Sequence, residues 1–183
     1  MIHFMVDFEN VKSAGLHGSE YLCSDDGVTI FYSNTCLKIE KEKMDDILKS
    51  GCGLHICKLQ NMGKNALDFY IASRIGEVFG SGYQGEIAII SKDKGFQAVQ
   101  DYWRYAKSPK NIVLNTNIEQ CILFSGEKSE RHDLIHRKKE HVDIEQEYRK
   151  YQEQLSASKK ETKKNVIMIP SLIKKVRTLC TQQ

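Results

Sequence analysis

The chain lacks any apolar stretch close to the ~18 residues that a helix needs to cross a bilayer. It begins directly with a strand-like run and shows no basic segment followed by a cleavable apolar one, so nothing marks it for secretion. Its six cysteines have spacings that match no disulfide framework or zinc motif, and we expect reduced thiols. These absences predict a cytoplasmic protein without membrane contact.

Composition and charge predict one well-buried domain with an appendage. The chain has 183 residues, of which 40% are hydrophobic and 28% are charged, as in ordinary soluble proteins. Residues 127–183 hold 14 Lys/Arg against 9 Asp/Glu, whereas residues 1–126 are slightly acidic. We therefore expect a domain at 1–126 and a charged, basic helical extension at 127–183. The extension could contact nucleic acid, or form a homodimer or protein interface through a narrow apolar stripe, although a solvated helix is the commoner outcome. The stripe consists of Ile144, Tyr148, Tyr151 and Leu155.

Strand-like and helical patterns alternate along the first 124 residues. The strand-like runs are 2–6, 28–32, 54–59, 86–90 and 111–114, and the helical patterns are 38–49, 65–79, 96–106 and 117–124. Parallel strands joined by helices take right-handed crossovers. The order therefore predicts an α/β fold, a three-layer α/β/α sandwich with a mostly parallel central sheet and the first strand in its centre.

Three aspartates stand where apolar runs break. Asp7 follows the first strand-like run, Asp93 follows the run at 86–90, and Asp68 lies at the start of the helical pattern at 65–79. Each has an ordinary explanation as a turn former, or as an acid near a helix N-terminus capped by Asn65. Together they would meet at the carboxyl edge of the sheet, where ligands bind in open α/β folds. Three acids there would repel one another unless a cation neutralised them.

Oxygen ligands with room for water suit Mg²⁺ or Mn²⁺, and such a site hydrolyses phosphodiesters. Glu9 lies two positions after Asp7 and would share its face of an extended strand, as a supporting metal ligand. Lys64 and Lys94 could contact substrate phosphates. Ser33 is a further possible phosphate contact, although a serine at a strand end is more often only a turn residue.

Three segments resemble the PIN-like nuclease superfamily, especially its NYN-type branch. They are Val6-Asp7-Phe8-Glu9-Asn10-Val11, Lys64-Asn65-Ala66-Leu67-Asp68-Phe69-Tyr70-Ile71-Ala72 and Ile90-Ser91-Lys92-Asp93-Lys94-Gly95-Phe96. The resemblance covers about residues 2–124. It implies a metal-dependent endoribonuclease acting on single-stranded or structured RNA, with Asp7, Asp68 and Asp93 as the catalytic, metal-binding acids. It also implies that Asn10 and Ser91 are polar groups that contact substrate or shape the site.

Two other functions remain open at this point. The family often has a further acid just after the third, where this chain has Lys94 and Gly95, so an inactive PIN-like module that binds RNA or protein is one alternative. A haloacid-dehalogenase-like phosphatase is the other. That chemistry requires an aspartyl nucleophile and a second aspartate two residues on, and the chain has Glu9 at the second position.

Overall fold

The computed structural model describes residues 1–34, 37–60, 63, 65–106, 109–126, 129–140, 145, 148–149 and 151–153. Five strands alternate with helices along this part of the chain. In order, they are β1 (Ile2–Asp7), α1 (Phe8–Val11), two 3₁₀ turns (Lys12–Leu16 and Ser19–Tyr21), β2 (Gly27–Tyr32), α2 (Lys41–Ser50), β3 (Gly53–Lys58), α3 (Ala66–Gly80), β4 (Glu86–Ile90), a 3₁₀ turn (Lys94–Phe96), α4 (Gln97–Arg104), β5 (Ile112–Asn115), α5 (Ile118–Phe124) and α6 (Glu130–Glu140).

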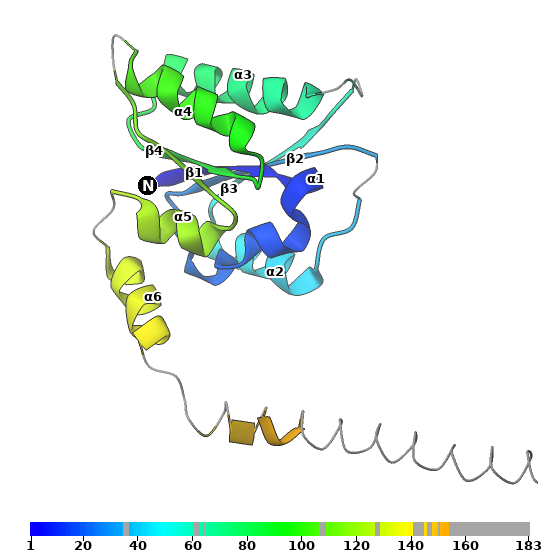
Figure 1. Ribbon diagram of the computed structural model, residues 1–183, viewed down its shortest axis with the longest axis vertical. Helices are drawn as coiled ribbons and strands as arrows, with labels where there is room; N and C mark the ends of the chain where they lie inside the picture. Colours follow the sequence, from blue (N-terminus) through cyan, green and yellow to red (C-terminus); the bar gives the residue numbers. More distant parts are fainter. Residues whose placement is uncertain are drawn as a thin grey trace, which may run out of the picture. The chain divides into compact units, whose positions relative to one another are not determined.

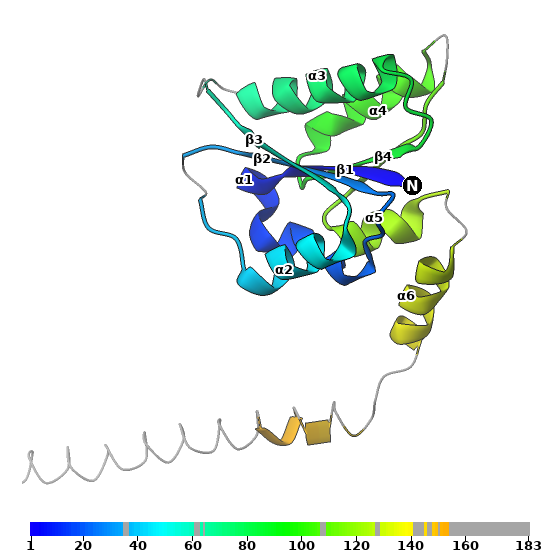
Figure 2. The ribbon, with the colours of Figure 1, turned by 180° about the vertical axis from the view of Figure 1, so that it is seen from behind.

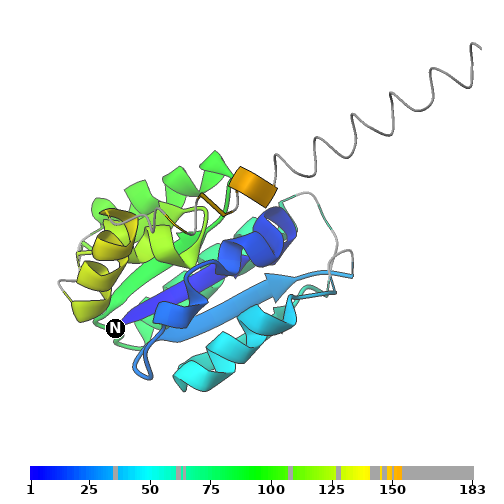
Figure 3. The ribbon, with the colours of Figure 1, turned by 90° about the horizontal axis from the view of Figure 1, so that it is seen from below.

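The five strands form one parallel sheet in the order β3-β2-β1-β4-β5. Strand β1 lies between β2 and β4, as Figure 3 shows. Helices α3 and α4 cover one face of the sheet, and α1, α2 and α5 cover the other (Figures 1 and 2). The predicted three-layer α/β/α sandwich with a central first strand is therefore confirmed, and the sheet is parallel throughout.

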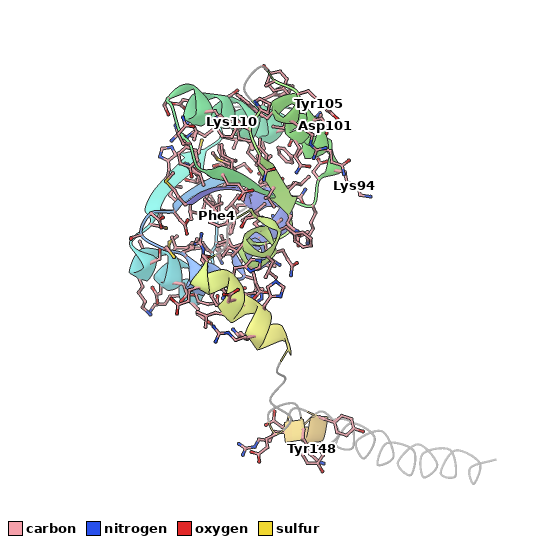
Figure 4. The ribbon with its side chains drawn as sticks, turned by 90° about the vertical axis from the view of Figure 1, so that its left-hand side faces the viewer. Phe4, Lys94, Asp101, Tyr105, Lys110 and Tyr148 are labelled. Atoms are coloured by element: carbon pink, nitrogen blue, oxygen red, sulfur yellow. The ribbon has the colours of Figure 1, made fainter. Side chains whose placement is uncertain are left out.

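Strand β1 is buried on both faces because each face has its own apolar core. Phe4 and Val6 belong to the core beneath α1, α2 and α5, and Phe4 is labelled in Figure 4. Met5 belongs to the core beneath α3 and α4. Side chains alternate between faces along a strand, so Asp7 projects to the same side as Met5. This alternation directs the first aspartate toward α3.

The structure differs from the sequence prediction in local detail. The segment expected as one helix at 96–106 is a 3₁₀ turn, Lys94–Phe96, followed by α4 at Gln97–Arg104. The two 3₁₀ turns between β1 and β2 carry no apolar periodicity and were not predicted. Strand β5 begins and ends one residue later than expected. Such boundaries depend on tertiary packing more than on local sequence.

The chain divides into two compact units, Met1–His136 and Arg137–Gln183. The domain boundary predicted between residues 126 and 127 stays a prediction, although the first unit extends into α6. In the second unit the described aromatic residues Tyr148 and Tyr151 are 60% and 56% exposed. Their predicted stripe partners Ile144 and Leu155 lie outside the described residues. No helix in the described ranges is long and apolar enough to span a membrane.

A buried ion pair fastens the start of α6 to the amino-terminal edge of the sheet. The guanidinium of Arg131 pairs with both carboxylate oxygens of Asp26, and its Nη1 also donates to the Tyr21 carbonyl. Asp26 accepts two further hydrogen bonds, from the Ile2 N–H at 2.9 Å and from the Cys23 N–H at 3.0 Å. The carboxylate is thus neutralised and hydrogen-bonded on both oxygens.

Removing this arginine should leave a buried, uncompensated charge. We expect Arg131→Ala to lower the free energy of unfolding by about 3–5 kcal/mol, measured by urea denaturation at neutral pH. Arg104→Ala is the matched control because its side chain is 64% exposed and pairs with Asp101 only at 3.8 Å, which is worth less than about 1 kcal/mol. Equal losses in the two variants would show that the buried pair does not anchor α6.

Candidate active site

Two neighbouring strands place Asp7 and Ser91 side by side at the carboxyl edge of the sheet. The register pairs Val6 with Ile90, so the residues that follow them are adjacent. The Ser91 hydroxyl donates to Asp7 Oδ2 at 2.7 Å, and the Asn10 N–H donates to Oδ1 at 3.2 Å. Asp7 is only 4% exposed. Its carboxylate is therefore held in one orientation by a bond to each oxygen.

Ser91 also links Asp7 to the loop that carries Asp93. The Ser91 Oγ accepts a hydrogen bond from the Asp93 N–H at 3.0 Å. Asp93 Oδ1 in turn accepts from the Gly95 N–H at 2.7 Å, which caps the 3₁₀ turn Lys94–Phe96. Asp93 is thus both a turn-capping residue and a member of the site.

The third aspartate lies in the first turn of α3. Asn65 precedes the helix with a left-handed backbone, φ 61°, and its side chain makes no capping hydrogen bond. Asparagine tolerates this conformation better than most residues. Asn65 is thus the N-cap residue, as predicted, but it begins the helix through its left-handed backbone and not through a side-chain hydrogen bond. This turn brings Asp68 to the same cleft as Asp7.

The three aspartates line one cleft of about 540 Å³. The described residues that line it are Asp7, Glu9, Asn10, Leu59, Gly63, Asn65, Ala66, Leu67, Asp68 and Asp93. Four of them are carboxylic acids and two are asparagines, while none is lysine, arginine or histidine. The described wall of the cleft thus supplies oxygen ligands and negative charge without a compensating cation.

This arrangement raises the pKa values of two of the acids. Burial raises the pKa of Asp7 above its usual value, and the charges of Asp68 and Glu9 add to the effect. The hydrogen bonds from Ser91 and Asn10 oppose it. Partial burial raises the pKa of Asp68, followed by repulsion from Asp93. Ionising both acids therefore costs free energy that a cation in the cleft would offset.

Of the other predicted site residues, some line the cleft and others do not. Glu9 and Asn10 line the cleft, whereas Ser91 lies behind Asp7 and is 3% exposed. Ser33 is completely buried and does not line the cleft, so the described geometry gives it no surface for a phosphate. Lys94 is exposed and extends away from the body of the fold (Figure 4). Lys64 lies outside the described residues.

Sequence reasoning did not assign a site role to Leu59, Gly63, Ala66 or Leu67, which also line the cleft. Leu59 follows β3, and its N–H donates to the Tyr32 carbonyl at 2.9 Å, which continues the pairing of β2 with β3. Its position at the end of the third strand run was the available signal. These apolar residues shape the cleft but carry no ionisable group.

The donor set fits a hard divalent cation. In the described ranges, the only three metal-ligating residues whose ligand atoms all lie within 4.8 Å of one another are Cys23, Asp25 and Asp26. That group lies at the opposite edge of the sheet, where Arg131 already neutralises Asp26. The aspartates of the cleft are more widely spaced. Mg²⁺ retains several waters and takes only one or two carboxylates directly, so wider spacing suits it.

Comparison with protein families matches this chain to a family described as the PIN domain, over residues 1–108. The chain belongs to the PIN domain family. Neither the curated proteins nor the solved structures provide a match. PIN domains are generally nucleases and typically use divalent metals, so the family supports a nuclease-type hydrolase. The match gives no support to the haloacid-dehalogenase-like alternative.

The raised pKa of Asp68 in this PIN domain predicts a gain in stability on neutralisation. A raised carboxyl pKa lowers stability as the pH rises through the folded-state value, and has no effect well below the unfolded value. We expect Asp68→Asn to raise Tm by up to a few degrees at neutral pH in EDTA, with the gain shrinking as the pH falls toward 4.

Thermal unfolding across that pH range measures the effect. Asp101→Asn is the control because Asp101 is 62% exposed on α4, away from the described lining of the cleft. A lower Tm for Asp68→Asn at neutral pH would contradict the interpretation of the cleft as electrostatically strained.

Proposed function

We propose that this PIN domain is an Mg²⁺- or Mn²⁺-dependent endoribonuclease of the NYN type. The observation that carries the proposal is the grouping of four carboxylates in one cleft whose described wall has no cationic side chain. A purely structural cluster of acids would be neutralised, as Asp26 is by Arg131 at the other edge of the sheet. Uncompensated acids at the ligand-binding edge of a parallel sheet favour a bound cation.

Asp7, Asp68 and Asp93 would hold the ion, one or two of them directly and the rest through its bound waters, with Glu9 as a supporting ligand. When bound, a divalent cation would neutralise charge on a phosphate oxygen and lower the pKa of its own water, which would make that water a better nucleophile. Hydrolysis then forms one phosphorus–oxygen bond from water and breaks another to the leaving ribose oxygen. The second ion that some nucleases use would have fewer acids available here, because Lys94 and Gly95 follow Asp93.

The chain's own contribution is orientation before substrate arrives. Ser91 and the Asn10 N–H fix the two oxygens of Asp7, and Ser91 also fixes the backbone of Asp93. The Asn10 side chain lines the cleft and supplies an amide that can orient water or phosphate. Groups already held in place need no reorganisation during the reaction, which lowers its barrier.

RNA is proposed as the substrate because of the resemblance to NYN-type domains. The exposed Lys94 would contact phosphates outside the cleft, where its chain extends (Figure 4). We retain the basic extension at 127–183 as a proposed contact with RNA, a second copy or a protein partner. A cytoplasmic location remains part of the same proposal.

Removing one acid should abolish cleavage without unfolding the protein. We expect the native chain to cut a mixed pool of single-stranded and structured RNA with Mn²⁺ or Mg²⁺, and to leave it intact in EDTA. Asp93→Asn should lower the rate by more than about a hundredfold, because it removes a proposed metal ligand. Gel electrophoresis of the products measures both effects.

Asp101→Asn provides the matched control and should cut at the native rate, since this exposed aspartate does not line the cleft. Cleavage by Asp93→Asn at the native rate would contradict the site. RNA binding without cutting, in the native chain and both variants, would favour the inactive binding module.

Ser91 offers a separate test of orientation. Ser91→Ala removes the hydrogen bond to Asp7 but no proposed metal ligand, so we expect the cleavage rate to fall about 10- to 100-fold. Ser91→Thr retains a hydroxyl and should recover part of the rate. Ser81→Ala is the control because the Ser81 hydroxyl donates to the Val78 carbonyl, at the far end of α3 from the cleft. A native rate for Ser91→Ala would show that the bond to Asp7 plays no part in orientation.

A further inference from the structure

A second hollow, of about 770 Å³, lies between α3 and the edge strand β3. Its floor includes Phe31 of β2 with His55 and Cys57 of β3. Its other wall includes Phe69 and Arg74 of α3. We call this hollow the α3 groove. It is larger than the acidic cleft and shares no described lining residue with it.

The α3 groove adjoins the acidic cleft on the same face of the sheet. The strand registers pair Asp7 with Phe31 and Phe31 with Cys57, so these three residues form one row across β1, β2 and β3. Residues in such a row project to the same face. Along α3, Asp68 lines the cleft and the next residue, Phe69, lines the groove. A chain leaving the cleft past this helix turn would enter the groove.

The groove presents an aromatic ring and a cation together. Phe69 is 69% exposed, so its ring is accessible to a ligand in the groove. Arg74 lies five positions further along α3, about 1.4 helical turns, and its Nη1 donates to Glu77 Oε2 at 2.7 Å. Its side chain remains 30% exposed. Glu77 also lines the groove. Its negative charge repels an anion there and partly neutralises Arg74.

We propose that the α3 groove receives an unpaired nucleotide of single-stranded RNA, next to the phosphate held in the acidic cleft. Phe69 stacks on the base and Arg74 contacts a backbone phosphate. The inference rests on the proposed nuclease function. Exposed aromatics beside cations are the usual platform for single-stranded nucleic acid, and bases within a duplex cannot be stacked upon in this way. The groove therefore selects single-stranded RNA.

Equilibrium binding of a short labelled single-stranded RNA tests the stacking. The full-length chain is titrated at low salt in EDTA, where a metal-dependent nuclease leaves RNA intact. We expect Phe69→Ala to weaken binding on the order of tenfold and Phe69→Trp to retain it. Phe124→Ala is the matched control, because Phe124 is 68% exposed at the end of α5 and should not affect binding. Duplex RNA should bind native and Phe69→Ala chains equally.

The charged pair in the groove provides a second test, because variants of its two residues should change RNA affinity in opposite directions. Arg74→Gln should weaken binding and reduce the slope of log affinity against log salt by about 0.7, the value for one phosphate contact on a single strand. Glu77→Gln should strengthen binding, because it frees Arg74 and removes a negative charge. If the pair had only a structural role, both variants would change RNA affinity in the same direction.

Cleavage of the same RNA by the native chain with Mn²⁺ separates this inference from the proposed function. If the native chain cleaves the RNA but the native and Phe69→Ala chains bind it equally, the groove proposal is wrong and the proposed nuclease function stands. Failure of the native chain to bind the RNA in EDTA would contradict the groove proposal, and failure to cleave it with Mn²⁺ would contradict the proposed nuclease function. Binding that depends on Phe69 supports the groove, and the absence of cleavage in that case would count against the nuclease alone. Unchanged melting temperatures of the variants confirm that they fold.

Discussion

The burial of Asp7, a carboxylate that has no cationic partner among the described residues of its cleft, is the constraint on which the carboxyl edge of this PIN domain depends. The fold contains a direct comparison, because Asp7 and Asp26 are both 4% exposed and lie at opposite edges of the sheet. Asp26 is paired with Arg131 and accepts two backbone hydrogen bonds. Asp7 has a hydroxyl and one backbone N–H, but further acids around it. At the amino-terminal edge the carboxylate is neutralised within the fold. At the carboxyl edge the carboxylate is left for a ligand to neutralise.

Packing of the apolar cores explains how the fold tolerates several acids at one edge of the sheet. The sheet holds Asp7 from β1, Ser91 after β4 and Asp68 from α3 through two apolar cores that pack on its opposite faces. Hydrophobic burial at these cores stabilises positions that electrostatic repulsion alone would separate. Functional sites commonly store strain of this kind, supported by the surrounding structure.

The strands and the convergence of the three aspartates could be predicted from the sequence, because both follow from short-range pattern. Apolar runs mark the strands, and parallel strands bring their carboxyl ends to one edge. The burial of Ser33, the left-handed turn at Asn65 and the exposure of Phe69 could not be predicted in this way. They depend on how α3 and the loops pack against the sheet, which no local pattern records. The pairing of Arg131 with Asp26 spans 105 positions and is likewise invisible to periodicity.

Helix α3 would have two roles in the proposed function. Its first turn supplies an acid to the cleft, and the following turns border a groove with aromatic and cationic groups. A substrate strand lying along this helix would have its phosphate and its base read by neighbouring residues, Asp68 through a cation and Phe69 directly. Strand β3, the edge of the sheet in the described fold, leaves the far side of that groove open.

The most direct test of the central claim is the shift in melting temperature that millimolar Mn²⁺ produces, compared between the native chain and Asp7→Asn. A cation that binds only the folded protein raises Tm by an amount that grows with the logarithm of its concentration divided by its Kd. We expect a clear rise in Tm for the native chain and little or none for Asp7→Asn, with no rise for either in Na⁺ of equal ionic strength. An equal shift in both chains, or none in the native chain, would contradict the claim that the buried Asp7 is balanced by a metal ion.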